Sequence, residues 1–591
     1  MSSLLELRLD DEKTAYFAGN TYSYRNMIKA IPGSRWEKKD KRWKIPLEST
    51  EDAVRMFPSL VVSEDVKHAY MRLRRRYDTA VAVKEAIKEA SDVPVEIPGL
   101  KGKLRPYQAV GKAFLDTLEE GEGAILAFDM GLGKSLTSLA YGVDLINRGV
   151  IDYILVVCPS PLKYATWEKE IKKWTDLEYV VIDGDKREVV EWDDGTQEKL
   201  TGKRLREVQY QQWMFGTKVI VMNYELFLHD EDILPPIDRR WLVILDEAHR
   251  IKNPKAKTTK TLIEKLKSSG RKVLGTGTPL ENNIQELYSL VNFCRPNLLG
   301  SYRKFIERYA ETDFFDNPIG PKPQMLEELR KRIAPIMIRV TKSDVLPDLP
   351  ELTVQEYWVH MTKKQEELYK QIRDGILQDA KTGEFTYLEV LAQITRVQQV
   401  LDSPALLRDV FNDDTLPVES GKLNELKNII SDIDPNRNKF ILFSQYREMT
   451  DILYDWLIEN EVLPKHKIGY VKGGVKSSEI ERIRKEFQEG DMQCIVMTTA
   501  GNYGLDLYNA RYVIRYDQLF NPQKMEQIIS RAHRMGNVTG VTAIHIVTRN
   551  SYEERKMKIL EEKREVFKAV VNEDDEALAK LFTKEELLEL L

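Results

Sequence analysis

The stretch AILAFDMGLGKS, residues 124–135, joins a short apolar run to a glycine-rich loop. The run AILAF is typical of a buried strand, and the residues after the loop, LTSLAYGVDLI, have the spacing of a helix. Glycines in such a loop let backbone N–H groups surround phosphate oxygens, and the helix presents its positive end to the anion. The stretch therefore predicts a strand, a phosphate-binding loop and a helix in succession.

Two side chains at the end of this loop suit a nucleoside triphosphate. Lys134 would reach the β- and γ-phosphates and Ser135 would hold Mg²⁺, as in the pattern G-x-x-x-x-G-K-[ST]. The match is incomplete because Phe128 stands at the first glycine position. A chance GKS after an apolar run is the alternative, so this loop does not decide the function by itself.

Further apolar runs alternate with amphipathic stretches in two parts of the chain. The first part contains GAILAF, YILVVCP, KVIVMNY, WLVILDEAH and KVLGTGTP, and the second contains NKFILFSQY, HKIGYVKGG, QCIVMTTA, RYVIRYDQ and TAIHIVT. Such alternation is typical of a parallel sheet with helices on both faces. Residues 301–404 have a largely helical pattern, apart from VQEYWVH. We therefore expect two α/β lobes with a helical section between them.

The expected fold class is α/β, with two tandem lobes, helical insertions and a small α+β module at the N-terminus. The stretch VPVEIPGLKGKL, residues 93–104, interrupts the pattern with Pro and Gly and is interpreted as a linker. The expected segments are an N-terminal module with a linker helix (1–92), a first lobe (93–300), a mostly helical region (301–420), a second lobe (421–560) and an acidic helical tail (561–591).

Composition excludes several classes of protein. The 591 residues are 42% hydrophobic and 31% charged, which excludes a disordered chain, a collagen-like repeat and a coiled-coil rod. Apolar runs stay short of the roughly 18 residues that span a membrane, and residues 1–13 lack signal-peptide features. We expect an intracellular protein, cytoplasmic, with nucleoid association in a prokaryote or virus and nuclear location in a eukaryote. Cys158, Cys294 and Cys494 lie too far apart for a metal knuckle.

The net charge of −5 opposes nucleic-acid binding, but the charge is unevenly distributed. Residues 21–50 contain eight Lys/Arg against three Asp/Glu, and residues 67–77 contain Lys67, Arg72, Arg74, Arg75 and Arg76 without an acid. Residues 561–591 contain ten acids and five bases. A solvated face is the ordinary interpretation of each run, but a protein can bind DNA along one basic surface whatever its total charge.

The run WLVILDEAH, residues 241–249, places two carboxylates after a buried strand. Ligands of α/β sheets bind at this edge. Asp246 suits the shell of a metal ion, and Glu247 suits orienting or deprotonating an attacking water. A helix-start cap is the alternative, but it is a poor one downstream of a phosphate loop.

The stretch EQIISRAHRMGN contains Arg531 and Arg534, which are three residues apart and are expected on one helix face. An arginine delivered from a second lobe can stabilise the charge that spreads over a transferring γ-phosphate. An Arg-x-x-Arg pair is usually a solvated helix face, so its value depends on the other motifs.

Eight motifs occur in a recognisable order. They are LRPYQ (104–108), DMGLGKS (129–135), VVCPSPLKYATWEKE (156–170), DEAH (246–249), GTGTPLENN (275–283), FSQY (443–446), TTAGNYGLDL (498–507) and RAHRMGN (531–537). This series resembles the superfamily-two helicase-like ATPases, and more narrowly the Swi/Snf-type DNA translocases. The resemblance implies two RecA-like lobes that bind ATP and Mg²⁺.

The resemblance also implies roles for single residues. Gln108 would recognise adenine, Ser135 and Asp246 would hold Mg²⁺, and Asp246 and Glu247 would form the hydrolytic pair. The residues that would bind the phosphates are Asp129, Met130, Gly131, Leu132, Gly133, Lys134 and Ser135. Arg531 and Arg534 would be arginine fingers, Gly504 and Asp506 would couple the second lobe to nucleotide and DNA, and Thr276, Thr278 and Gln527 would relay the nucleotide state.

Five positions depart from the family pattern. Phe128 replaces a usual Asp, Asn502 a Gly, Asp506 an Asn, Phe520 a Trp and Asn537 a Gln. These changes leave every group that does chemistry in place. They put the coupling between motifs in question, while ATP hydrolysis is still expected.

The expected function is a DNA-dependent ATPase that translocates on duplex or branched DNA as a monomer, with both arginines in the same chain as the phosphate loop. It would remodel or anneal branched DNA or displace bound protein in replication, repair or recombination. One alternative is a strand-separating helicase or the motor subunit of a restriction system. Another is a non-catalytic DNA-binding scaffold, which the intact set of catalytic residues disfavours.

Residues 16–47, YFAGNTYSYRNMIKAIPGSRWEKKDKRWKIPL, resemble the HARP domains that precede the motor in annealing helicases. Aromatic side chains beside bases offer stacking surfaces and phosphate-binding charge. The alternative is that the aromatics form the core of a small module and only the bases are exposed. The residues concerned are Tyr16, Tyr22, Tyr24, Trp36 and Trp43, with Arg35, Lys38, Lys39, Lys41, Arg42 and Lys44.

Overall fold

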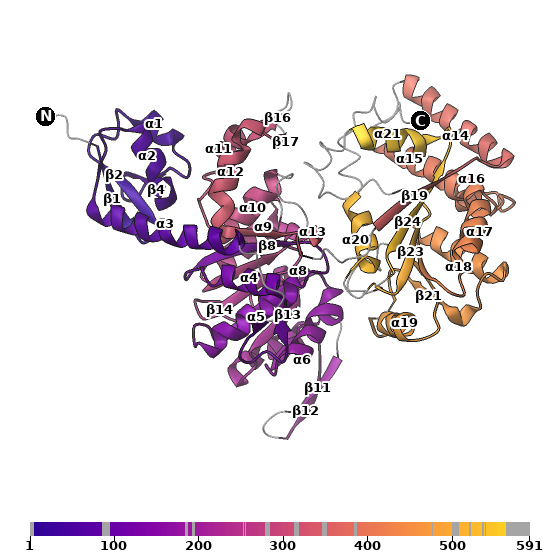
Figure 1. Cartoon of the computed structure of the whole chain (residues 1–591), viewed down its shortest axis with the longest axis horizontal. Helices are drawn as coiled ribbons and strands as arrows, with labels where there is room; N and C mark the ends of the chain where they lie inside the picture. Colours follow the sequence, from indigo (N-terminus) through magenta and orange to yellow (C-terminus); the bar gives the residue numbers. More distant parts are fainter. Residues whose placement is uncertain are drawn as a thin grey trace. The chain divides into compact units, whose positions relative to one another are not determined.

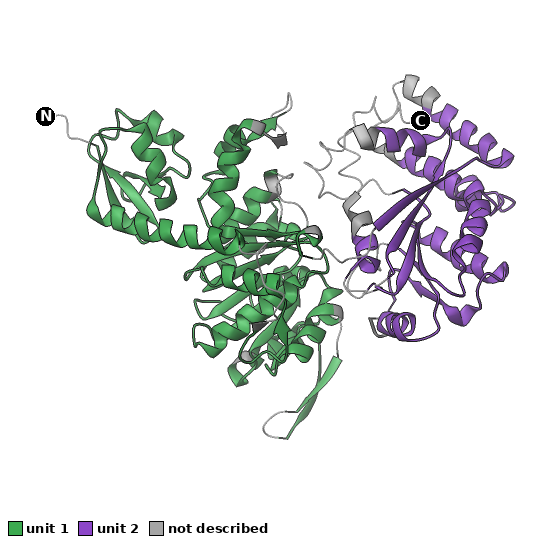
Figure 2. Cartoon of the chain, in the orientation of Figure 1, with its two compact units in different colours: residues 1–345 green, residues 346–591 purple. Residues whose placement is uncertain are grey.

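The computed structural model of the chain forms two units, residues 1–345 and 346–591 (Figure 2). Each unit contains its own parallel sheet covered by helices (Figure 1), so the predicted α/β class with two sheet-bearing lobes is confirmed. The structure describes residues 5–85, 95–183, 187–191, 195–251, 253–254, 256–277, 284–312, 318–345, 352–382, 387–475, 477–498, 507–518, 522–534, 537 and 539–562.

The sheet of the first unit has seven strands among the described residues, in the order β10-β13-β9-β14-β15-β8-β18. All neighbouring strands are parallel. The five apolar runs predicted in this part of the chain form its five inner strands, which are almost wholly buried. The bounds are β8 (Glu122–Phe128), β9 (Tyr153–Cys158), β10 (Tyr179–Val181), β13 (Val219–Asn223), β14 (Trp241–Leu245), β15 (Arg271–Gly275) and β18 (Met337–Val340).

Helices follow the strands of this sheet and bury their apolar faces against it. A second group of helices, α10 to α12, follows the last inner strand and packs into the same apolar core. The bounds are α4 (Pro106–Leu115), α5 (Lys134–Asn147), α6 (Lys169–Trp174), α7 (Gly202–Gln211), α8 (Tyr224–His229), α9 (Lys257–Leu266), α10 (Ile284–Cys294), α11 (Tyr302–Tyr309), α12 (Leu326–Ile333) and α13 (Lys342–Val345).

The sheet of the second unit has six strands among the described residues, in the order β19-β24-β23-β20-β22-β21, and all neighbours are parallel. The bounds of its strands are β19 (Leu352–Val359), β20 (Lys439–Phe443), β21 (Ile468–Val471), β22 (Cys494–Met497), β23 (Ala510–Arg515) and β24 (Val541–Thr548). The bounds of its helices are α14 (Lys363–Thr382), α15 (Tyr387–Asp402), α16 (Arg408–Phe411), α17 (Gly421–Ile433), α18 (Arg447–Glu459), α19 (Ser477–Glu489), α20 (Pro522–Ala532) and α21 (Tyr552–Glu562).

Residues 301–420, expected to be mostly helical, also supply an edge strand to each sheet. The predicted strand-like piece VQEYWVH lies within β19, which pairs with β24. The strand β18 pairs with β8 and has no counterpart in the sequence-based prediction. Pro335 separates its four residues from α12, but an apolar run as short as this cannot be told from a helix by periodicity.

The N-terminal module is a five-stranded sheet with three helices. Its strands lie in the order β3-β4-β2-β1-β5 and are antiparallel, except that β1 and β5 are parallel. The bounds are β1 (Glu6–Asp11), β2 (Thr14–Ala18), β3 (Arg35–Glu37), β4 (Arg42–Pro46), β5 (Val61–Val62), α1 (Arg25–Ala30), α2 (Thr50–Met56) and α3 (Glu64–Glu85).

The aromatic side chains of this module divide between its core and its surface. Trp43 is buried in the apolar core. Tyr22, Tyr24 and Trp36 are 75%, 41% and 45% exposed. The guanidinium of Arg25 lies 4.4 Å from the ring centroid of Tyr22. The alternative, an aromatic core, therefore holds for Trp43, whereas stacking of the exposed aromatics on DNA stays a prediction.

Buried ion pairs join the module to the first sheet. Arg295, which follows α10, lies 2.7 Å from the carboxylate of Glu48 in the module and 3.4 Å from that of Glu122 on β8. Arg76 on α3 lies 2.9 Å from Glu122. These four side chains are at most 15% exposed. Because breaking a buried ion pair leaves an uncompensated charge, the module is a structural part of the first unit.

The described residues of the first unit also form three two-stranded antiparallel sheets. The predicted linker contains one of them, formed by β6 (Val95–Glu96) and β7 (Lys103–Leu104). The others are β11 (Arg187–Glu191) with β12 (Gln197–Thr201), and β16 (Ala310–Thr312) with β17 (Pro318–Pro321). The three cysteines are buried free thiols. In the part of the chain that is described, every helix is too short or too polar to cross a membrane.

Candidate active site

The glycine loop lies between the end of β8 and the start of α5. Gly131 and Gly133 have φ values of +87° and +80°, in the left-handed region that favours glycine. A Cβ atom on Gly133 would lie only 2.3 Å from Nε2 of Gln108. The loop therefore requires glycine at position 133 for both its backbone and its close contact.

Gln108 connects the loop to α4. Its Oε1 accepts a hydrogen bond from the backbone N–H of Arg105 at 3.0 Å, and its Nε2 donates to the carbonyl of Leu132 at 3.1 Å. The buried amide thereby fixes both the start of α4 and the glycine loop. The contact of Gln108 with adenine stays a prediction.

The first residues of the loop contact the edge strand β18. The backbone N–H of Asp129 donates to the carbonyl of Val340 at 2.9 Å, and its carboxylate accepts from the N–H of Lys342 at 2.9 Å. Arg339 lies 3.7 Å from the same carboxylate. Asp129 thus fixes the loop to the last strand of the sheet, and Met130 follows it opposite Gly277.

Lys134 is the first residue of α5, and its side chain is buried. Its Nζ donates to the carbonyl of Phe128 at 2.9 Å. A Cβ atom on Gly277 would lie 3.5 Å from this Nζ, and one on Gly275 would lie 3.3 Å from Oδ1 of Asp246. The structure therefore brings Lys134 and Asp246 together beside Gly275, the last residue of β15, and Gly277 just after it.

The carboxylates of Asp246 and Glu247 follow β14 at the carboxyl edge of the sheet, as predicted. Burial first, and the charge of Glu247 second, raise the pKa of Asp246 to about 6, against the lowering effect of Lys134. Glu247 has a φ of +49°, which is uncommon for a residue other than glycine. Its carboxylate lies 3.3 Å from Nδ1 of His249.

These groups fit a magnesium–triphosphate complex. Positive-φ glycines expose backbone N–H groups, and a helix N-terminus with a buried ammonium attracts phosphate. Mg²⁺ prefers hard oxygen ligands, such as the carboxylate of Asp246 and the hydroxyl of Ser135, the second residue of α5. A Cβ atom at position 277 would lie 3.0 Å from Cγ of Met130 and 3.5 Å from Nζ of Lys134, so the glycine keeps the surroundings of the ammonium uncrowded.

The second unit contains the predicted arginines. Arg531 lies in the last turn of α20, and its carbonyl accepts from the N–H of Leu507 at 3.0 Å. The prediction that Arg534 shares its helix face is wrong, because α20 ends at Ala532 and Arg534 lies in the bend that follows. Gln527 lies in α20. Gly504, Asp506 and Thr278 lie outside the described residues.

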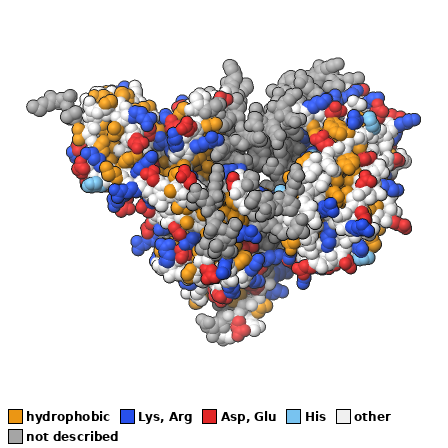
Figure 3. All heavy atoms as spheres, in the orientation of Figure 1, with side chains coloured by type: hydrophobic (Ala, Val, Ile, Leu, Met, Phe, Trp, Pro, Cys, Tyr) orange, Lys and Arg blue, Asp and Glu red, His pale blue; other side chains and the backbone are white. Residues whose placement is uncertain are grey.

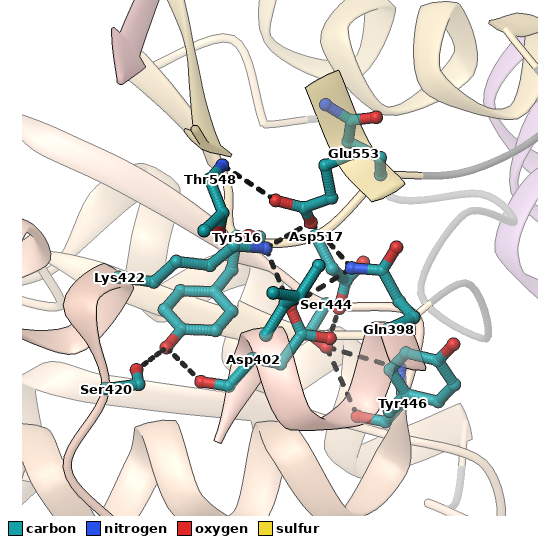
Figure 4. A network of polar contacts seen from close by, with 12 residues as sticks. Gln398, Asp402, Ser420, Lys422, Ser444, Tyr446, Tyr516, Asp517, Thr548 and Glu553 are labelled. Carbon is teal, nitrogen blue, oxygen red and sulfur yellow. Dashed lines mark hydrogen bonds and ion pairs between the residues drawn. The ribbon is translucent and has the colours of Figure 1, made fainter. Parts of the chain in front are cut away.

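A buried polar cluster lies at the carboxyl edge of the second sheet (Figure 4). Lys422 on α17 donates to Asp402 at 2.8 Å and also to Glu553 on α21. Asp517, two residues after the end of β23, accepts from the hydroxyl of Ser444 and from the backbone N–H of Gln445 at 3.0 Å. Because Ser444 and Gln445 belong to the predicted FSQY motif, this cluster fixes that motif in place.

Comparison with known proteins identifies the family. Residues 107–416 match the SNF2-related domain, and residues 421–536 match the helicase conserved C-terminal domain. The chain belongs to the SNF2-related family. This confirms the predicted family and the predicted enzyme class, an ATP hydrolase with the two helicase-like domains.

Two curated relatives of this SNF2-family chain are 28% identical to it. They are TATA-binding protein-associated factor mot1 of Aspergillus fumigatus, aligned over 85% of this chain and 28% of the relative, and the CHD3-type chromatin-remodeling factor PICKLE of Arabidopsis thaliana, aligned over 78% and 34%. The chain thus spans about a third or less of their length. A solved structure, the Sulfolobus solfataricus SWI2/SNF2 ATPase core in complex with dsDNA, is 26% identical over 84% of this chain and 99% of that one, with a TM-score of 0.39.

Sequence reasoning assigned no role to several residues that hold the site of this SNF2-family chain. Trp167 donates its indole N–H to Asp246 at 2.9 Å, and Tyr224 donates its hydroxyl to the carbonyl of the same residue at 2.9 Å. Trp167 lies inside the motif 156–170, so the sequence marked this residue but could not show that it contacts Asp246. Tyr224 and Lys422 lie outside the eight motifs, and the sequence contains no comparable signal for them.

Proposed function

We propose that this SNF2-family chain is a DNA-stimulated ATPase that moves along duplex DNA without separating the strands. Its output would be displaced protein, moved branches or annealed strands. The observation that carries the proposal is the convergence of the glycine loop, Lys134 and Asp246 at one edge of the first sheet. The relatives named mot1 and PICKLE support a role on DNA or chromatin.

Hydrolysis would use the groups that lie at this edge. The N–H groups around Gly131 and Gly133, with Lys134, would bind the phosphates, and Ser135 and Asp246 would hold Mg²⁺. Bound Mg²⁺ neutralises charge on the β- and γ-phosphates. Glu247 orients the attacking water and accepts its proton. This arrangement stabilises charge that develops on the transferring phosphoryl group.

The second unit would complete the site. Arg531 and Arg534 would stabilise the charge that develops on the γ-phosphate, and ATP hydrolysis with product release would end this contact. If the two lobes bind DNA phosphates in turn, each cycle of ATP hydrolysis would move the protein one step along the DNA. Because phosphate loop and arginines belong to one chain, a monomer is sufficient for the reaction.

The first test of this proposal compares ATP turnover without DNA and with single-stranded, duplex and forked DNA. We expect low turnover alone and a strong increase with duplex or forked DNA. Turnover that is independent of DNA would contradict the proposal. Displacement of a strand from a tailed duplex would instead favour the strand-separating helicase.

The N-terminal module offers a second surface for DNA, in line with its resemblance to HARP domains. On α3, His68, Arg72 and Arg75 are exposed, and their spacing places them on one helix face. Figure 3 shows blue side chains along the edge of the module where Figure 1 places α3. Such a stripe suits a row of phosphates, whereas Arg76 of the same run faces inward to Glu122.

Replacing Arg72 and Arg75 by glutamate should weaken DNA binding. It should also lower the number of counterions released on binding by about two, because each neutralised phosphate releases about one counterion. ATP turnover without DNA should not change. Point substitutions are preferable to deletion of residues 1–92, since deletion would leave Arg295 buried without Glu48.

The matched control for these variants has the same charge change on the second unit, Arg437→Glu with Arg482→Glu, where both side chains are well exposed. Binding is measured by titration at several salt concentrations. Equal salt slopes for the two double variants would contradict the assignment of a DNA-binding surface to α3.

A further inference from the structure

Three hydrogen bonds fix the turn at Asp246 and Glu247, here called the Asp-Glu corner. Oδ2 of Asp246 accepts from Nε1 of Trp167 at 2.9 Å. Oδ1 accepts from the backbone N–H of Glu247 at 3.0 Å, and the backbone carbonyl of Asp246 accepts from the hydroxyl of Tyr224 at 2.9 Å. Every oxygen of Asp246 therefore has a donor, and two of the donors come from other elements of the sheet edge.

Trp167 reaches the corner from a π-helical turn, η2 (Lys163–Glu168). Single π turns are rare and often occur at functional sites, because the wider turn redirects a side chain. The indole of Trp167 is fully buried, and the turn is held by Lys163, whose buried Nζ donates to the carbonyl of Ile182 at 2.9 Å. The unusual backbone thus aims one N–H at one carboxylate oxygen.

Tyr224 reaches the corner from a second element, the helix α8. It is the first residue of α8, directly after β13, and its ring is 3% exposed. Its hydroxyl holds the carbonyl of Asp246, the group that precedes the left-handed residue Glu247. A residue other than glycine keeps a positive φ only where several surrounding contacts hold its backbone in place. The bond from Tyr224 is one of the contacts that do so.

We infer that Trp167 and Tyr224 are positioning residues of the active site, acting through the Asp-Glu corner. Trp167 orients the carboxylate of Asp246 toward the magnesium position, and Tyr224 holds the backbone that sets the direction of the Glu247 carboxylate. This inference rests on the proposed roles of Asp246 and Glu247 in hydrolysis. It assigns a positioning task to two residues that contact Asp246.

Two conservative variants test the two contacts. Tyr224→Phe removes only a hydroxyl and Trp167→Phe removes the indole N–H. Loss of a residue that orients a ligand typically costs about 10- to 100-fold in metal affinity or activity. We expect Trp167→Phe to raise the Mg²⁺ concentration for half-maximal ADP binding by about 10-fold, and Tyr224→Phe to lower kcat by about 10-fold with little change in KM for ATP.

Matched controls remove the same chemical groups elsewhere in the first unit. Tyr210→Phe deletes a buried hydroxyl that donates to Asp230 at 3.0 Å, and Trp174→Phe deletes an indole N–H that donates to Glu170 at 2.7 Å. Both controls should bind Mg²⁺ and ADP and turn over ATP as the unmodified chain does. Calorimetric titration of ADP at several Mg²⁺ concentrations measures binding independently of activity.

A double-mutant cycle with Asp246→Asn separates positioning from general packing. If Trp167 acts through Asp246, Trp167→Phe has little further effect on Mg²⁺-dependent ADP binding once Asp246 is neutralised, because residues in one network are not additive. Additive losses would overturn the inference for Trp167. If Trp167→Phe does not fold, the nearly isosteric Tyr224→Phe decides, and an unchanged kcat in that variant would overturn the inference.

The same series distinguishes this inference from the proposed function. If Asp246→Asn and Glu247→Gln still hydrolyse ATP at the normal rate, the proposed site is wrong. If both are inactive while Trp167→Phe and Tyr224→Phe behave like their matched controls, the site is right and only the positioning roles are wrong.

Discussion

Replacing Glu247 by glutamine is expected to lower DNA-stimulated ATP turnover by about 10²- to 10⁴-fold, the usual contribution of a general base. The amide keeps the size of the side chain but cannot accept a proton from water. Since Glu247 lies beside Asp246 at the end of β14, its neutralisation also removes a repulsion that raises the pKa of Asp246. The variant should therefore still fold and bind ATP. Phosphate release in the presence of duplex DNA measures the effect.

The matched control is Glu264→Gln on α9, where the carboxylate is 69% exposed and pairs with Lys267 on the surface. This control should hydrolyse ATP normally. Lys134→Ala supplies an independent check, because it removes the buried ammonium and should weaken phosphate binding as well as turnover. Normal turnover in either Glu247→Gln or Lys134→Ala would contradict the assigned site.

The sequence predicted the central strands of both sheets because buried parallel strands are continuous apolar runs. It also predicted that Asp246 and Glu247 follow such a strand, since that position depends only on the local order of residues. The edge strand β18 is short and follows a helical pattern, so its four residues gave no distinct signal. Local pattern therefore predicted the fold better in its centre than at its edges.

Contacts between distant parts of the chain were beyond this kind of prediction. The Trp167 indole meets Asp246 across 79 positions of sequence, and Lys422 meets Glu553 across 131. Spacing rules describe neighbours within one element, whereas these pairs depend on the order of strands in the sheet. The spacing rule gave a wrong prediction for Arg534. The rule assumes that the helix continues, but α20 ends at Ala532.

Replacing Lys422 by methionine is expected to destabilise the second unit by about 3–5 kcal/mol, the cost of removing one partner of a buried ion pair. Lys422, Asp402 and Glu553 are all fully buried (Figure 4). Burial alone would lower the pKa of Lys422, but the two carboxylates raise it above its ordinary value. Methionine fills a similar volume, so the loss would come from two carboxylates left without their cation.

Hydrogen exchange of individual peptides measures this effect, because a chain with two units does not unfold as one two-state system. Protection should fall in peptides from α17, β23 and α21, while β14 in the first unit serves as an internal reference. The control substitution is Lys472→Met, which breaks a partly exposed pair with Asp451. Exposed pairs contribute about 0–1 kcal/mol, so this control should have little effect.

The triple variant Lys422→Met, Asp402→Asn, Glu553→Gln separates charge from packing. If unpaired carboxylates cause the loss, neutralising both of them restores part of the protection, as replacement of whole buried ion pairs by neutral groups often does. Unchanged protection in Lys422→Met alone would show that the cluster does not stabilise the unit. Because Asp517 binds Ser444 and Gln445 in the same cluster, we expect the FSQY motif to lose protection together with α17.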